Sequence, residues 1–343
     1  MNLFERDIAV DMGTSTTLLY VQGNGVVQRE PTVVAVDKTT GKMLKMGEDA
    51  KKILGRTPAN VVSIHPISAG VISDYDMSAL MLRELLNKVT SFSRFKPRLL
   101  VCVPSSISGV EERAVIDAAI EAGARKVYLV ETAVATAVGA GMNIKNADGH
   151  MVIDIGGGTT EVAVVSMGGV VECDSIKTAG NSFDEAIIRY IKKKYNLLIG
   201  AKTAEELKIR IGGVMPRPDA DSEEVKGRCT LTGLPKTVTV SSAELVDVMK
   251  EPALRILESV HSVLENTPPE LIGDLSTNGI IMSGGGSLLY GLNAIIERST
   301  KLPTMLVDDP ISCAAHGAGK ILSVLDDMQE GMMNFQRSRE MKR

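Results

Sequence analysis

The chain has 343 residues, of which 44% are hydrophobic and 23% are charged, and its formal net charge is −4. This length favours two domains over a single core, and the composition is that of a globular protein in water. The small negative charge gives no general reason to expect a nucleic acid as partner, and no apolar run reaches the ~18 residues that a membrane span needs.

The first half of the chain predicts alternating strands and helices. Residues 6–36 are expected to form three short strands, because apolar and β-branched residues recur in runs broken by glycine-rich turns. A lysine-rich, less regular stretch follows, and leucines at helical spacing then predict a helix over 76–90 behind an aspartate cap. The next segments are a strand, a helix, a strand and a small-residue helix, at 98–104, 108–124, 126–131 and 132–142. This order predicts an α/β domain with partly parallel pairing.

After a turn-like piece at 143–150 the same pattern starts again. Residues 150–180 predict three more strands with tight turns, and helices are expected at 181–195 and 203–211. Residues 212–235 are expected to hold short strands at best. A long helical region at 241–266 is expected to open with a capping box, from Ser241 to Glu244 or with the same spacing one residue later. A strand, a glycine turn and a helix follow at 278–300, and the end of the chain is helical and then basic.

Two segments about 143 residues apart share one pattern. "IAVDMGTSTTLLYV" (8–21) and "MVIDIGGGTTEVAVV" (151–165) each contain an apolar strand, an aspartate, one apolar residue, a glycine, a small-residue turn with threonine, and a further strand. A dinucleotide-binding fold would place a helix directly after its glycines. Here the residues after the glycines are β-branched and alternate as in a strand. Each segment is therefore predicted to be a β-hairpin.

These two hairpins are predicted to hold a triphosphate. Glycines let backbone N–H groups approach phosphate oxygens, and the neighbouring hydroxyls add donors. Asp11 and Asp154, at the ends of their strands, are placed to bind Mg²⁺ or its waters, because hard cations prefer carboxylate oxygens. One such hairpin is equally well explained as an ordinary glycine turn. Two with the same pattern imply two related domains that close on a triphosphate from opposite sides.

A third glycine stretch, "MSGGGSLLYGL" (282–292), follows a strand and opens a helix. Its backbone is expected to approach a base or a ribose; the alternative is a tight turn that binds nothing. Together with the hairpins and two small-residue helices, this turn resembles the actin, Hsp70 and sugar-kinase superfamily. From about residue 6 to 325 the chain resembles the MreB family of bacterial actins, in "VVQREPTVVAVD", "ILGRTP", "GVISDYD", "LLIGAKTAEELKIRIG" and "TPPEL", all in the same order.

The resemblance implies an actin-like ATPase fold, a duplicated ribonuclease H-like α/β architecture with two lobes and four subdomains around a nucleotide cleft. The expected subdomains are IA (1–32 and 65–144), IB (33–64), IIA (145–180 and 251–330) and IIB (181–250), with a basic tail at 331–343. It further implies ATP and Mg²⁺ as cofactors. The implied function is a cytoplasmic filament on the inner face of the membrane, which organises cell shape and wall synthesis with the cell-wall elongation machinery.

The same resemblance assigns nucleotide contacts to individual residues. It places the first phosphate loop at Gly13, Thr14, Ser15 and Thr16, the second at Gly156, Gly157, Gly158, Thr159 and Thr160, and the nucleoside contacts at Glu206, Lys208, Gly284, Gly285, Gly286 and Leu288. Without the resemblance, Glu206 and Lys208 would be interpreted as a solvated helix face.

The chain departs from the family at one catalytic position. Relatives usually read "EEPMAAAIGAG" where this chain has "ETAVATAVGAG" (131–141), so Glu131 matches the first glutamate and Thr132 replaces the second. In the family the second carboxylate helps to position the attacking water. A threonine hydroxyl is a poor base at neutral pH, and loss of a general base lowers a rate by about 10² to 10⁴. We predict ATP binding with slow hydrolysis at Glu131, Thr132 and Thr160, unless Glu131 shifts into reach.

Two phenylalanines suggest a membrane contact. Phe92 and Phe95 lie between a predicted helix and a predicted strand, beside Arg94, Lys96 and Arg98. An exposed loop of this kind is expected to touch a membrane; the alternative is that both rings pack into the core. Burial of two phenylalanine side chains contributes about 3 to 6 kcal/mol. Membrane binding is therefore expected to follow polymerisation, which multiplies the contacts.

Two other protein classes share the paired hairpins. A sugar or acetate kinase needs a catalytic carboxylate that faces an acceptor pocket, and the sequence offers no candidate outside the nucleotide motifs. A chaperone of the superfamily would need a peptide-binding domain after the nucleotide core. The favoured interpretation is a cytoskeletal ATPase of the actin type that assembles with itself.

Overall fold

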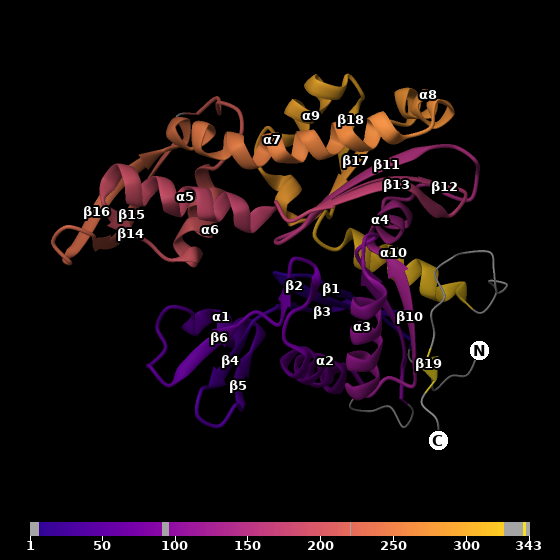
Figure 1. Cartoon of the computed structure of the whole chain (residues 1–343), viewed down its shortest axis with the longest axis horizontal. Coiled ribbons are helices and arrows are strands. Elements are labelled where there is room, and N and C mark those ends of the chain that lie inside the picture. Colours follow the sequence, from indigo (N-terminus) through magenta and orange to yellow (C-terminus); the bar gives the residue numbers. More distant parts are fainter. Residues whose placement is uncertain (1–6, 91–95, 220, 326–338, 341–343) are drawn as a thin grey trace.

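The computed structural model describes residues 7–90, 96–219, 221–325 and 339–340, which form two α/β lobes (Figure 1). The first lobe contains a six-stranded sheet in the order β19-β10-β9-β1-β2-β3. Its strands are β1 (Ile8–Met12), β2 (Thr16–Val21), β3 (Gly25–Pro31), β9 (Arg98–Val103), β10 (Lys126–Glu131) and β19 (Arg339–Glu340). β1 pairs antiparallel with β2 and parallel with β9, and β9 pairs parallel with β10. Helices α2 (Tyr75–Thr90) and α3 (Gly109–Glu121) share a hydrophobic core with this sheet.

The second lobe repeats this arrangement. Its five-stranded sheet has the order β13-β12-β11-β17-β18, in which β11 pairs antiparallel with β12 and parallel with β17. The strands are β11 (His150–Ile155), β12 (Thr160–Ser166), β13 (Gly169–Ile176), β17 (Ile280–Ser283) and β18 (Thr304–Leu306). Helices α5 (Gly180–Tyr195), α7 (Ser242–Asn266) and α9 (Leu292–Thr300) contribute to its core, and α8 (Pro269–Asn278) contacts β11. The predicted duplication is therefore present in the pairing of the strands.

A small sheet extends from each lobe on the same side of the molecule (Figure 1). In the first lobe it consists of β4 (Val34–Asp37), β5 (Met43–Met46) and β6 (Val61–Ile64), with helix α1 (Gly47–Ile53). In the second it consists of β14 (Leu197–Leu198), β15 (Ser222–Cys229) and β16 (Pro235–Ser241), with helix α6 (Ala201–Ile211). A two-stranded ribbon, β7 (Ile67–Ser68) and β8 (Val71–Ile72), leads back to the first lobe.

These small sheets correct two expectations from the sequence. The stretch after residue 37 is more regular than its lysine content indicates, and β15 is a strand of eight residues where short strands at best were expected. Only Val225 and Cys229 of β15 are buried, so its hydrophobic signal is weak, and antiparallel pairing with β16 holds it in place. β16 follows β15 after residues 230–234, but with so few buried positions the alternation that would predict this hairpin gives little signal.

The two lobes meet at the small-residue helices α4 (Thr132–Gly139) and α10 (Cys313–Ser323), which pack against each other at their junction (Figure 1). The backbones approach so closely that a Cβ on Gly317 would lie 1.7 Å from the carbonyl oxygen of Ala135. Only small side chains permit such a crossing. This explains why alanine and glycine dominate both helices.

The helix predictions are largely confirmed, with differences at the termini. α2 begins at Tyr75, and its cap is Asp74, whose Oδ1 accepts from the N–H of Met77 at 3.0 Å. At α7 the Ser241 hydroxyl accepts from the Glu244 N–H as predicted, but the Glu244 carboxylate binds tyrosine hydroxyls and leaves the capping box half made. Within the part of the chain that is described, no helix is long and apolar enough to cross a membrane.

Candidate functional site

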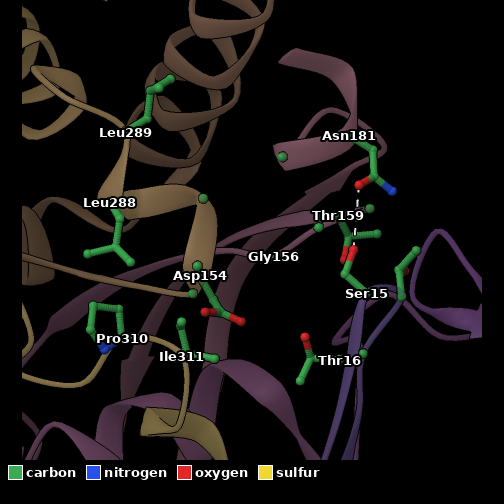
Figure 2. A pocket seen from close by; sticks show the side chains of 18 of the residues that line it. Ser15, Thr16, Asp154, Gly156, Thr159, Asn181, Leu288, Leu289, Pro310 and Ile311 are labelled. Atoms are coloured by element: carbon green, nitrogen blue, oxygen red, sulfur yellow. Dashed lines mark hydrogen bonds between the residues drawn. The ribbon is translucent and has the colours of Figure 1, made fainter. Parts of the chain in front are cut away.

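A cavity of about 490 Å³ lies between the two lobes and is lined by strand ends and turns of both. Figure 2 shows Ser15 and Thr159 at one end, Leu288 and Pro310 at the other, and Asp154 between them. The cavity therefore has a polar end and an apolar end. The sequence-predicted residues that line it are Asp11, Gly13, Thr14, Ser15, Thr16, Thr132, Asp154, Gly156, Gly157, Gly158, Thr159, Lys208, Gly284, Gly285, Gly286 and Leu288; Glu131, Thr160 and Glu206 are not among its lining residues.

The turn between β1 and β2 is the first hairpin turn, as predicted from the sequence. The N–H of Gly13 donates to the carbonyl oxygen of Thr16 at 3.1 Å and closes the turn. Thr14 Oγ1 accepts from the N–H of Gly70 at 3.0 Å, which ties the turn to its own lobe. The Ser15 hydroxyl instead donates across the cavity to Asn181 Oδ1 at 3.5 Å (Figure 2). This turn presents side-chain hydroxyls.

The turn between β11 and β12 is the second hairpin turn, and it presents bare backbone. Its carbonyl oxygens accept from the N-terminus of α5: Gly156 from the N–H of Gly180 at 3.1 Å, and Gly157 from the N–H of Asn181 at 2.8 Å. The two turns touch each other. A Cβ on Gly157 would lie 2.6 Å from the Cβ of Ser15, closer than carbon atoms can approach. Glycine is required here because the opposite lobe occupies the space.

Asp11 and Asp154 face the cavity from equivalent positions in the two lobes. Burial, and to a smaller extent the negative charge of Asp154, raise the pKa of Asp11 to about 7. Burial likewise raises the pKa of Asp154 to about 6. Two buried carboxyls without a compensating cation fit a divalent ion that neutralises both and takes its other ligands from phosphate and water. No group of three or more His, Cys, Asp or Glu in the described ranges could hold a metal by itself.

Alternation along β12 decides which residues reach the cavity. Thr159 and Glu161 line it, whereas the Thr160 side chain between them is fully buried and donates its hydroxyl to the Thr178 carbonyl oxygen at 2.7 Å. Successive side chains of a strand point to opposite faces. The Thr160 hydroxyl thus faces away from the cavity, and Glu161 is a residue that the sequence analysis missed although strand alternation could have found it.

Around the positions predicted to be catalytic, at the start of α4, Thr132 lines the cavity, and its hydroxyl donates to the carbonyl oxygen of Val103 at 3.1 Å. Burial raises the pKa of Glu131. Burial also raises the pKa of Glu161 to about 8, although the N–H of Ser105 donates to its carboxylate. The carboxylate that faces the cavity in this region therefore belongs to Glu161 and comes from the second lobe.

Helix α6 contributes Glu205 and Lys208 to the cavity wall, while Glu206 is exposed. Residues three apart share a helix face, and the residue next to Glu205 points about 100° away. The Lys208 ammonium donates to the Gly180 carbonyl oxygen and to Asp184 Oδ2, both at 2.9 Å. The acidic residue on this wall is thus one position earlier than the sequence analysis expected, and helical spacing relative to Lys208 could have identified it.

The apolar end is built on the glycine turn after β17. Gly284 has a φ of +80°, which a residue with a side chain rarely adopts, and a Cβ there would lie 2.2 Å from the Ile155 carbonyl oxygen. A 3₁₀ helix, η1 (Gly285–Leu288), follows and precedes α9. Arg217 and Tyr290 extend this wall, with the guanidinium carbon 5.0 Å from the ring centroid. No local sequence signal brings these two residues together.

Phe92 and Phe95, the predicted membrane contact, lie outside the described residues, so their prediction remains untested.

The family of this chain follows from comparison with known proteins. The family model described as MreB/Mbl protein matches residues 5–330. The chain belongs to the MreB/Mbl family. Among its curated MreB/Mbl relatives, the cell shape-determining protein Mbl of Bacillus cereus is 46% identical over 325 residues, which cover 94% of this chain and 98% of that protein.

Solved structures agree with this membership. The MreB5 protein of Spiroplasma citri matches with TM-scores of 0.91 in its ADP-bound structure and 0.88 in its AMPPNP-bound structure, at 36% identity. These matches cover 94% of this MreB/Mbl-family chain and 98% and 97% of the solved chains. The MamK double helical filament matches in fold, with a TM-score of 0.79 and 21% identity over 95% of this chain and all of that chain. The predicted family and actin-like fold are therefore confirmed, and the family is one of cell-shape-determining cytoskeletal proteins.

Proposed function

We propose that this chain binds ATP with Mg²⁺ in the cavity between its two lobes and polymerises into filaments that organise cell shape. The observation that carries the ATP site is the meeting of two hairpin turns across one cavity, one rich in hydroxyls and one of bare glycine backbone. The Spiroplasma relative is a nucleotide-bound protein, which supports a nucleotide at the equivalent place.

Each part of the cavity suits one part of ATP. The two turns would donate to the phosphate oxygens from the Thr14 hydroxyl, whose oxygen accepts from Gly70 and whose proton is left to donate, and from backbone N–H groups. Asp11 and Asp154 would hold Mg²⁺, which supplies positive charge against the triphosphate when bound. Glu205 is placed for the ribose hydroxyls, and Leu288 with Pro310 offers an apolar surface to the base. The proposed subdomain boundaries place this cavity where IA, IIA and IIB meet.

The test of the ATP site is direct. A fluorescent ATP analogue should bind the purified chain in the presence of Mg²⁺, and unlabelled ATP should displace it. Electron microscopy with ATP should then show filaments, while a coupled assay on common sugars should show no phosphoryl transfer. Transfer to a sugar without filaments would favour the alternative, a small-molecule kinase of the same superfamily.

Slow hydrolysis is part of this proposal, because threonine stands at position 132. The Thr132→Glu variant is expected to release phosphate about 10² to 10⁴ times faster than the parent chain, since it adds a carboxylate at the cavity wall. Phosphate release by equal amounts of the two proteins, with ATP affinity measured in parallel, checks this. If the variant is no faster at equal occupancy, position 132 does not limit hydrolysis.

We further propose that the filament lies on the inner face of the cytoplasmic membrane, where it meets the cell-wall elongation machinery. The support is the pair of phenylalanines among basic residues at 92–98 in the sequence. Replacement of both Phe92 and Phe95 by serine should abolish sedimentation of the polymer with anionic liposomes. Unchanged sedimentation would exclude this loop as the anchor.

A further inference from the structure

The cavity walls carry four carboxylates, and three of them have a place in the proposed ATP site. Asp11 and Asp154 form the proposed cation site, and Glu205, on α6, is proposed for the ribose. The fourth is Glu161, at the start of β12 directly after the second hairpin turn. Nothing in the proposed binding of phosphate, cation or ribose uses it.

The hydroxyls expected at the reaction centre already donate to backbone carbonyls. Thr132 donates to Val103, and Thr160 donates to Thr178 on the far side of its strand. A hydroxyl whose proton is committed in this way can only accept a hydrogen bond from a water, and it cannot take the water's proton at neutral pH. Neither threonine can therefore act as the proton acceptor of the site.

Glu161 has the properties of a fixed acceptor once its carboxyl has lost its proton, which burial makes it hold more tightly because the pKa is raised to about 8. The side chain is 5% exposed, and the Ser105 N–H from the first lobe donates to its Oε1. Its second oxygen, Oε2, has no hydrogen-bond partner among the described residues. A buried carboxylate oxygen without a partner is costly, and such groups persist where a ligand or water completes them. The bond from Ser105 also means that the carboxylate is oriented only when the two lobes are together.

We propose that Glu161 is the catalytic carboxylate of this chain, in place of the glutamate missing at position 132. The inference rests on the proposed binding of ATP in this cavity. Glu161 Oε2 accepts a hydrogen bond from the attacking water. As the water oxygen bonds to the terminal phosphorus, the bond from that phosphorus to the bridging oxygen of ADP breaks, and the water's proton passes to Oε2. ADP and inorganic phosphate leave, and the proton is returned to solvent.

The experiment compares Glu161→Gln with the parent chain under saturating ATP and Mg²⁺. Glutamine keeps the size of the side chain and an oxygen that accepts from Ser105, but it cannot take a proton. We expect an ATP affinity within about threefold of the parent, an unchanged or higher melting temperature, and single-turnover phosphate release at least ~100-fold slower. Glu172→Gln, a matched change on the neighbouring strand β13, should leave the rate unchanged.

A second variant covers the case in which glutamine is not tolerated. Glu161→Asp keeps the charge and withdraws the carboxylate by one methylene, so phosphate release should fall at least ~10-fold while ATP still binds. In a Thr132→Glu background the Glu161→Gln change should lower the rate much less, because the new carboxylate takes over the proton.

The outcomes separate the two proposals. Failure of the parent chain to bind ATP would overturn the proposed function and this role with it. Two results would overturn the role of Glu161 alone. One is a parent chain that binds ATP but releases no phosphate above background. The other is phosphate release by Glu161→Gln and Glu161→Asp within threefold of the parent rate. Glu161→Gln protein that binds ATP as tightly as the parent chain but releases phosphate slowly would support the role of Glu161.

Discussion

The two hairpin turns occupy the same place in two repeated sheets, yet they are built in opposite ways. In the first lobe the turn between β1 and β2 carries hydroxyls, and Thr14 and Ser15 use them to contact Gly70 and Asn181. In the second lobe the turn between β11 and β12 carries no side chain at Gly157 or Gly158, because the first turn fills that space. The two hairpin turns thus have equivalent positions but different roles. The first carries hydroxyl groups, and the second, without side chains, leaves the space that the first turn fills.

The strongest way to break this complementarity is Gly157→Ala. Its Cβ would lie 1.9 Å from Ser15 Oγ and 2.6 Å from Ser15 Cβ, so the turns must separate. We expect ATP affinity to fall by about 100-fold or more, as for other overpacked contacts that cost 1–3 kcal/mol or more. Isothermal titration with ATP and Mg²⁺ measures this.

Two further variants test the physical reason. Gly156→Ala lies in the same turn, but its Cβ would meet only the Thr159 carbonyl oxygen, at 3.3 Å, so its effect should be much smaller. Removal of the opposing side chain in a Gly157→Ala, Ser15→Gly double variant should recover most of the lost affinity. If all three variants lose the same amount of ATP affinity, the close contact between Gly157 and Ser15 is not the cause of the loss.

The second prediction uses the paired aspartates at the bases of the turns. The pKa is raised to about 7 for Asp11, to about 6 for Asp154 and to about 8 for Glu161; burial is the largest cause in each case, and the charge of Asp154 is the smaller cause at Asp11. The ordinary values of these carboxyls are about 4. A raised pKa means that the folded state holds the proton more tightly than the unfolded state does. The free energy of unfolding of the nucleotide-free protein should therefore fall as pH rises from about 5 to 8.

The size of this effect is on the order of a few kcal/mol, which corresponds to a melting temperature several degrees lower at pH 8 than at pH 5. Thermal melts across this range measure it. Carboxyls with a lowered pKa, such as Glu111, titrate below this window. Asp11→Asn should flatten the pH dependence, whereas Asp148→Asn, at an exposed carboxyl, should not. A parallel slope in Asp11→Asn would assign the pH dependence to other groups.

The sequence predicts those parts of the site that lie within one short segment of the chain. The aspartate and glycine of each hairpin follow from the strand periods around them, and both hairpins are confirmed. Glu161 and Glu205 line the cavity and were not predicted, although each is the next residue to a predicted one, Thr160 on a strand and Glu206 on a helix. Strand alternation and helical spacing in the sequence could have identified both.

Other features depend on contacts between distant segments. The stacking of Arg217 on Tyr290 joins residues 73 positions apart, and the Ser105 N–H meets Glu161 from the opposite lobe. No periodicity encodes such contacts, because their energy arises only once the fold has brought the segments together.

The smallest predicted effect concerns the two small sheets that extend from the lobes. Lys51 of α1 and Glu205 of α6, which lines the cavity, form an ion pair between the two lobes, with Nζ 3.0 Å from Oε2. Both side chains are 35% exposed, so the pair contributes less than about 1 kcal/mol. Lys51→Ala should speed release of a fluorescent ATP analogue by about 2- to 5-fold, and salt should reduce the difference.

Lys52 on the same helix provides the matched control, because it pairs with Asp49 of its own helix at 3.2 Å and does not cross the cavity. Lys52→Ala should release the analogue at the parent rate, and Lys51→Arg should restore most of the slow release. If Lys51→Ala and Lys52→Ala release the analogue equally fast, the ion pair between α1 and α6 does not hold the lobes together. Their association would then depend on other contacts, among them the two hairpin turns, the α4–α10 junction and the bond from Ser105 to Glu161.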